Sequence, residues 1–206
     1  MSKTSRKFHV PDALAHLYDF ANTADLRRFV HNGIQHQAAD ELGSPRDLTN
    51  WLKLNGLLSQ GGNVTTKAFD AAIELRASIR AFLAKESAER HLDKEIVRRL
   101  NRAVKPFPLI VRVSASNRMV LESARNDALG SLCAVVAQLY DGSANGTLSR
   151  LKICASEECQ RVFYDRSKPG TRRWCQAALC GNRMKTRAYR ERKKQAAPLN
   201  AFNPVT

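Results

Sequence analysis

Apolar positions recur at helical spacing over most of the first 140 residues. Ser44-Pro45 joins an N-cap residue to a proline at the first helical position, which predicts the start of one of these helices. Asp93 is the expected N-cap of another. The predicted helices cover residues 11–21, 66–85 and 125–140, the stretch between Ser44 and Gly56, and the stretch between Asp93 and Pro106.

Two short apolar runs break the helical pattern. Leu109–Val113 and Met119–Leu121 flank the polar segment Ser114–Asn117, and this arrangement predicts a β-hairpin. Residues 25–43 contain apolar side chains at mixed spacing, interrupted by Gly33 and two histidines, and predict no definite element. The expected fold class is therefore mainly α with a small β-hairpin, an α+β N-terminal domain.

Domain boundaries are predicted from turn-rich and polar segments. Asp141–Thr147 is rich in Gly, Ser and Asn, which is typical of a linker, and the sequence after Gln195 resembles a loose tail. A chain of 206 residues is long enough to bury a sizeable core. The predicted division is a domain over 1–142, a linker over 143–150, a finger with a basic helix over 151–195 and a flexible tail over 196–206.

The charge changes the picture because it is large and uneven. The net charge is +15, and residues 151–206 contribute 13 basic and 4 acidic side chains. This excess predicts an acidic partner, nucleic acid first. The longest uncharged apolar stretch has 13 residues (128–140), too short to span a bilayer, and residues 1–10 lack the apolar region of a secretory signal. We expect a cytoplasmic protein whose five cysteines form no disulfide framework.

Four of the five cysteines follow the spacing C-x4-C-x15-C-x4-C, at Cys154, Cys159, Cys175 and Cys180. Two close pairs joined by a loop can aim four thiolates at one tetrahedral zinc ion. The segment has few large apolar residues, so a metal would be its main support. Four cysteines fill the zinc shell and leave no open position for water, so the expected Zn²⁺ is structural and no enzyme activity is predicted.

A basic helix is predicted after the last cysteine. Cations at 183, 187, 190 and 194 share one face of that helix, which could lie in or along a groove of duplex DNA. The alternative is a solvated basic helix end. The predicted nucleic-acid contacts are Arg172, Arg173, Arg183, Lys185, Arg187, Arg190 and Lys194.

Three further positions have two interpretations each. Asp165 could pair with a nearby arginine side chain or cap the turn at Ser167–Gly170. Asn22 and Thr23, at the end of an apolar helix, could line a ligand pocket or terminate the helix with their side chains. Cys133, on the apolar stripe of its helix, is predicted to be a core residue.

The segment Leu151–Arg183 closely resembles the CGNR zinc finger. The first C-x4-C, the F-x-D at Phe163, the RRWC that ends at Cys175 and the CGNR that starts at Cys180 all match. The N-terminal part resembles the ABATE domain that is usually fused to this finger. That resemblance rests on Leu17–Thr23, on D-L-x-x-W-L from Asp47 to Leu52, and on Leu75-Arg76.

The resemblance implies a bacterial transcription regulator in which the four cysteines hold zinc and the basic finger contacts double-stranded DNA. The N-terminal domain would sense a signal or form a homodimer. Two alternatives stay open: an RNA- or ribosome-associated zinc protein, and a zinc-stabilised adaptor for protein interactions. Any of the three could also respond to oxidants that release zinc. The sequence shows no catalytic dyad, no phosphate-binding loop and no open metal site.

Overall fold

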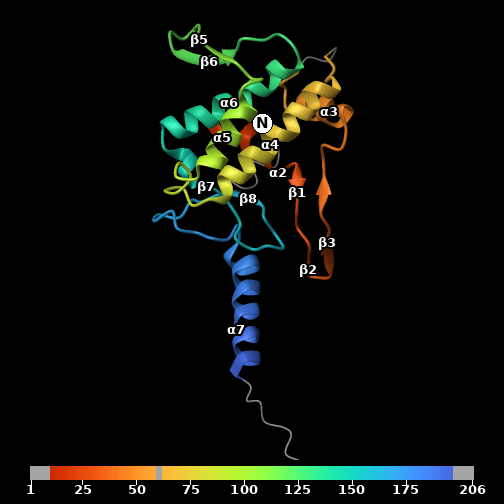
Figure 1. Ribbon diagram of the computed structural model, residues 1–206, viewed down its shortest axis with the longest axis vertical. Helices are drawn as coiled ribbons and strands as arrows, with labels where there is room; N and C mark the ends of the chain where they lie inside the picture. The colour runs from red at the N-terminus through yellow and green to blue at the C-terminus, as the bar shows by residue number, and fades with distance from the viewer. Residues whose placement is uncertain (1–9, 59–61, 197–206) are drawn as a thin grey trace, which may run out of the picture. The chain divides into compact units, whose positions relative to one another are not determined.

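The structure, a computed structural model, describes residues 10–58 and 62–196 and divides the chain into two units, Met1–Cys175 and Gln176–Thr206. The first unit contains most of the helices together with four small β-ladders (Figure 1). Within the described residues, no helix is both long and apolar enough to cross a bilayer. The tail predicted for 196–206 lies outside the described residues, except for its first residue, which ends a helix.

The predicted helices are present, and each of the four longer ones begins at a capped residue. The N-cap side chains are Ser44, Thr65, Asp93 and Asp127, and each accepts a hydrogen bond from the backbone three residues later. The helices of the first unit are η1 (Asp12–Leu14), α2 (Ala15–Asn22), α3 (Pro45–Leu54), α4 (Thr66–Ala84), α5 (Lys94–Val104), α6 (Ala128–Ala144) and η2 (Thr147–Arg150).

The predicted hairpin is confirmed as β5 (Leu109–Val113) and β6 (Met119–Ser123), paired from Leu109 opposite Ser123 to Val113 opposite Met119. The other ladders are also two-stranded and antiparallel. Their strands are β1 (Ala24–Asp25) with β4 (Ala39–Asp40), β2 (Phe29–His31) with β3 (Ile34–His36), and β7 (Leu151–Ile153) with β8 (Val162–Tyr164).

The ladders over residues 24–40 are the main element that the hydrophobic pattern missed. The turn between β2 and β3 is Asn32-Gly33, and both residues have positive φ, 48° and 73°. Asn-Gly is the preferred pair for a two-residue hairpin turn, because both positions need the left-handed region. The Asn32-Gly33 dipeptide alone could have predicted the β2–β3 hairpin. The irregular spacing of the apolar residues around it argued against strands.

The core of the first unit forms around α2, whose Leu17, Tyr18 and Phe20 are fully buried. Helices α4 and α6 pack against it and contribute Leu75, Ile79 and Leu132. Cys133 is also buried, which confirms its prediction as a core residue. The core is built from helix faces at 3.6-residue spacing, as the sequence pattern predicted.

The polar segment after Tyr140 does not end α6, contrary to the expected linker composition. The helix continues to Ala144, and Gly142 is buried within it at a close approach to η1: a Cβ at this position would lie 2.7 Å from Leu14 Cδ2. A glycine here therefore serves helix packing, not chain flexibility. The segment 143–150 thus holds the end of α6 and η2, with Leu148 buried, while the domain boundaries themselves stay a prediction.

The hairpin β7–β8 belongs to this same core. Leu151 and Val162 are fully buried in the hydrophobic cluster that includes α2 and α4. The first part of the predicted finger is thus packed as an element of the larger unit. This placement matters because the first two cysteines lie beside this hairpin.

Candidate metal centre

The four predicted zinc ligands come together in space. The Sγ atoms of Cys154, Cys159, Cys175 and Cys180 all lie within 4.8 Å of one another, and three of these residues are buried. Cys159 Sγ and Cys175 Sγ are 3.6 Å apart. Zinc–thiolate bonds of about 2.3 Å in a tetrahedron place sulfurs about 3.8 Å apart, so this donor set fits zinc. The cluster is consistent with a structural Zn²⁺ held by four thiolates.

The first cysteine pair is shaped by the turn at the end of β7–β8. Cys154 N–H donates to the carbonyl of Arg161 at 2.9 Å, which closes the hairpin. The backbone N–H groups of Cys159 and Gln160 both donate to Ser156 O, and Gln160 adopts a positive φ of 47°. The tight turn brings the second cysteine of the pair back towards the first.

Side chains of the N-terminal domain hold this hairpin in place. Asn22, the last residue of α2, donates from Nδ2 to Val162 O at 3.1 Å and accepts from Val162 N–H at 3.0 Å. Its amide therefore pairs with β8 as a neighbouring strand would. Arg80 of α4, itself buried, donates to Ala21 O at 2.7 Å and to Gln160 O at 2.8 Å. A strand edge and a cysteine turn are thus both anchored from outside the finger.

Arg90 fixes the other end of the hairpin. This arginine is only 4% exposed, and its guanidinium donates to Leu148 O at 2.9 Å and to Leu151 O at 2.7 Å. The guanidinium also donates hydrogen bonds to Lys85 O and Leu83 O, so all of its partners named here are backbone carbonyl groups. Burial lowers the pKa of Arg90 to about 10, so the guanidinium stays charged at neutral pH.

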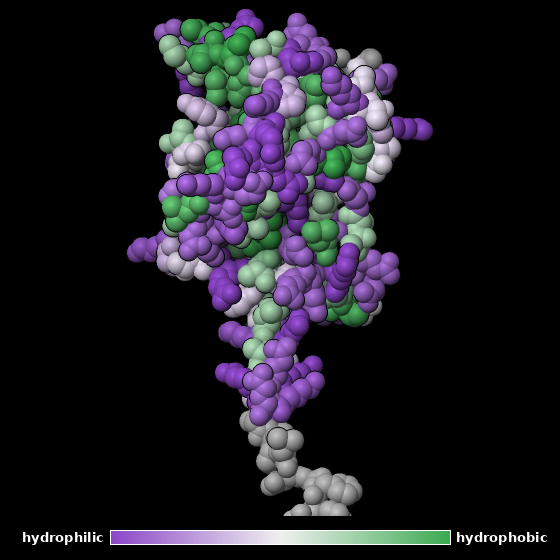
Figure 2. Space-filling view, viewed as in Figure 1, coloured by the Kyte–Doolittle hydropathy of each residue, from purple (hydrophilic) through white to green (hydrophobic). Residues whose placement is uncertain are grey.

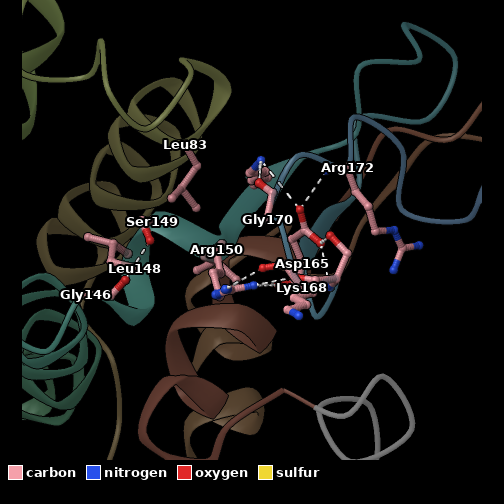
Figure 3. A network of polar contacts seen from close by, with 12 residues as sticks. Leu83, Gly146, Leu148, Ser149, Arg150, Asp165, Lys168, Gly170 and Arg172 are labelled. Carbon is pink, nitrogen blue, oxygen red and sulfur yellow. Dashed lines mark hydrogen bonds and ion pairs between the residues drawn. The ribbon is translucent and has the colours of Figure 1, made fainter.

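Asp165 organises the loop that leads from β8 to the second cysteine pair (Figure 3). One carboxylate oxygen accepts from Ser167 N–H and Oγ, and the other accepts from Arg172 N–H at 2.7 Å. Of the two interpretations, turn capping is confirmed, because the arginine contributes its backbone. Burial would raise the pKa of Asp165, but these hydrogen bonds and the charge of Lys152 lower it overall.

The two arginines before Cys175 have different environments. Arg172 is half-buried, donates to Cys175 O at 2.9 Å and lies over the Phe163 ring. Arg173 is exposed and lies over the Trp174 ring at 5.6 Å. Both line a cavity of about 380 Å³ between the end of α4 and β7, together with Lys152. Arg173 is thus available to a ligand, whereas Arg172 also supports the loop.

The second unit contains the π-helical turn η3 (Ala177–Gly181) and α7 (Asn182–Ala196). The predicted basic helix is confirmed as a helix. Arg183 is half-buried, whereas the other predicted contacts on this helix are exposed. Those exposed cations are Lys185, Arg187, Arg190 and Lys194. Their contact with nucleic acid stays a prediction.

Asn22 and Thr23 make hydrogen bonds that favour the structural alternative considered for them. Besides its bonds to Val162, Asn22 donates to Tyr18 O one turn back. Thr23 Oγ1 donates to Phe20 O and accepts from Arg76, a buried arginine that also pairs with Asp40. The ligand pocket stays an untested prediction, and sequence spacing gave no signal for the anchoring roles of Arg80 and Arg90.

Comparison with known families separates the same two segments. Residues 15–141 match the family described as ABATE, "Putative stress-induced transcription regulator". Residues 150–193 match the CGNR zinc finger. None of the curated proteins searched matches the chain. The ABATE match spans more than half of the 206 residues and the finger match contains all four clustered cysteines, so the chain belongs to the ABATE family and carries a C-terminal CGNR zinc finger.

Proposed function

We propose that this protein is a zinc-dependent regulator of transcription that binds double-stranded DNA through its finger. The observation that carries the proposal is the charge of α7. Residues 182–195 hold seven basic side chains and one acidic one, and most of them are exposed. Such a density of cations suits the phosphate backbone, whose neutralisation releases counterions and supplies most of the affinity. The family to which the chain belongs supports the same conclusion.

Zinc has a structural role in this proposal. Four thiolates complete the shell of the ion, so no position remains for a water nucleophile or a substrate. The metal would fix the turn before α7 and so set the start of the helix, while the arginines make the contacts. The protein acts by binding and catalyses no reaction.

The test is fluorescence anisotropy of the zinc-loaded full chain on mixed-sequence duplex DNA. Binding should weaken by about two to three orders of magnitude between about 50 and 200 mM salt if four to six phosphates are contacted. Arg190→Gln should reduce affinity and the salt slope. Arg112→Gln, an exposed arginine on β5, is the matched control and should change neither. Absence of binding at the lower salt would contradict the proposal.

An RNA partner would use the same cations. Competition between duplex DNA and structured RNA of equal length separates the two, because both compete for the same phosphate-binding side chains. An adaptor for proteins would differ from both, since its affinity for its partner would not depend on the salt concentration. We favour duplex DNA because α7 has a single exposed aromatic residue, Tyr189, and single-strand binding uses several stacking platforms.

The N-terminal domain is proposed to sense a signal or to form a homodimer in the cytoplasm. Apolar side chains are exposed on the β5–β6 hairpin (Figure 2). The pairing of the strands puts Val111, Val113 and Met119 on one face of it. In a two-fold dimer the same patch meets itself, so an apolar face is self-complementary. Sedimentation should show a dimer at micromolar concentration that Val111→Lys dissociates. A monomer at that concentration would contradict dimerisation.

A further inference from the structure

We infer that α7 lies in the major groove of DNA and reads base edges with one defined stripe of side chains. This stripe consists of Asn182, Thr186, Tyr189 and Lys193, none of which belongs to the cationic face recognised from sequence. The inference rests on the proposed function and names the residues that would give it sequence specificity.

The stripe follows from the geometry of the helix. At about 100° per residue, Arg183, Arg187, Arg190 and Lys194 fall within about 60° of one another. Lys185 and Arg192 lie on nearly the opposite side of the helix, and the base-reading stripe lies between these two cationic edges. The helix thus presents cation, polar stripe and cation in order around its circumference.

That order matches the cross-section of a major groove. A helix of about 10–12 Å diameter fills a groove about 12 Å wide, and phosphates border it on both sides. Two opposed cationic edges would contact the two strands, while the stripe between them would face the floor of the groove. A helix that merely coated a flat anionic surface would need cations on one side only.

The remaining arc supports this orientation because it holds no cation. It contains Met184, Ala188, Glu191 and Gln195, and its Glu191 pairs with Arg187 at 3.1 Å. A carboxylate would be repelled by phosphates, so this arc would point out of the groove. The helix has no continuous apolar face in its sequence, and the side of it that Figure 2 shows is mainly hydrophilic. It is therefore unsuited to a membrane surface or a coiled coil.

The stripe also has the right chemistry. Asparagine can pair with adenine through two hydrogen bonds, and a threonine methyl can contact the methyl group of thymine. Thr186 Oγ1 donates to Asn182 O at 2.9 Å, which holds its side chain on the helix. Lys193 lies over the ring of the exposed Tyr189 at 5.5 Å. Both contacts arrange side chains of the stripe along one line without drawing them into a core.

The test begins with selection of preferred sites from randomised duplexes by the zinc-loaded full chain. Affinity for the selected site is then compared with affinity for mixed-sequence DNA. Thr186→Ala and Tyr189→Ser should reduce this ratio roughly tenfold each and leave the salt slope unchanged. Lys185→Gln should weaken binding to both DNAs equally and lower the salt slope by about one. Gln195→Ala, on the outward arc, is the matched control and should change neither quantity.

Chemical footprinting provides a second readout that does not depend on variants. Bound protein should protect guanine N7, in the major groove, from methylation and leave adenine N3, in the minor groove, reactive. Protection of adenine N3 alone, failure to select any site, or stripe variants with an unchanged ratio would each overturn the inference. Salt-dependent binding would survive any of those outcomes, whereas absence of all DNA binding would overturn the proposed function itself.

Discussion

The two cysteine pairs of the finger are supported by different kinds of structure. The first pair lies beside β7–β8, whose Leu151 and Val162 are buried in the core and whose backbone is bound by Asn22, Arg80 and Arg90. The second pair is followed by η3 and α7, and within the described residues the hydrophobic cluster around α2 has no member after Tyr164. One zinc ion would therefore bind a first cysteine pair that the core already holds in place and a second pair whose surroundings depend on the ion for their fold.

The difference changes the role of the metal. The composition alone predicts that zinc is the main support of the whole finger. The buried hairpin shows that apolar burial and hydrogen bonds already order its first half, as they order any core element. The metal's contribution to folding therefore concentrates on the segment from the loop after β8 to α7.

Removal of zinc is the change from which we expect the largest effect, and it should separate the first half of the finger from the second. A structural zinc contributes about 10–16 kcal/mol to small zinc-finger peptides, and Cys175→Ser would forfeit most of it. We expect amide exchange to become fast over residues 176–195, while α2, α4 and β8 stay protected. Cys133→Ala, outside the cluster, should retain one zinc per chain. Loss of protection over the whole chain would show that the halves are not distinct.

Arg90→Ala tests the other side of the comparison. The substitution leaves the carbonyls of Leu148 and Leu151 without a buried donor, at a cost of about 3 kcal/mol in the free energy of unfolding. Chemical denaturation of the zinc-loaded protein should show this loss. Arg98→Ala, an exposed arginine on α5, should cost less than about 0.5 kcal/mol. An equally small loss for both variants would refute the anchoring role.

Asn22→Ala should have a smaller effect at the same hairpin. It removes the paired hydrogen bonds to Val162 N–H and O, which we expect to cost about 2 kcal/mol. Asn22→Asp keeps an acceptor for the Val162 N–H group and loses the donor to the Val162 carbonyl. Its stability should therefore fall between that of the wild type and that of Asn22→Ala. Amide exchange at Val162 measures this directly, and unchanged exchange in Asn22→Ala would contradict the assignment.

Asp165→Asn is the mildest of the four changes and adds a dependence on pH. The pKa of Asp165 is lowered in the folded state, so its carboxylate stabilises the fold above the unfolded pKa of about 4, and that contribution is lost as the pH falls through the folded pKa. The variant should be about 1 kcal/mol less stable at pH 7. The difference in the free energy of unfolding between the wild type and Asp165→Asn should become smaller below about pH 4. A difference that stayed constant with pH would exclude the Asp165 carboxylate as its cause.

Residues with local signals were predictable, and residues with distant partners were not. The caps at Ser44 and Asp93, the β5–β6 hairpin and the four-cysteine cluster all follow from spacing over a few residues or from a strict motif. The anchoring roles of Arg80 and Arg90 could not be found in that way, because the hairpin carbonyls that they bind lie 58 to 80 residues away in the chain. The Asn32-Gly33 pair indicates a hairpin turn, but the residues on either side do not alternate between apolar and polar as strands usually do.

The burial of β7–β8 has a consequence for attempts to exchange fingers between proteins. A fragment that ended at residue 142 would lose Leu148, Leu151 and Val162 and leave open the part of the core that they fill. A transplanted finger that began at residue 151 would in turn carry Leu151 and Val162 into water. The functional unit for such a graft is therefore α7 with its preceding turn, joined after Cys175 to a recipient that keeps its own hairpin.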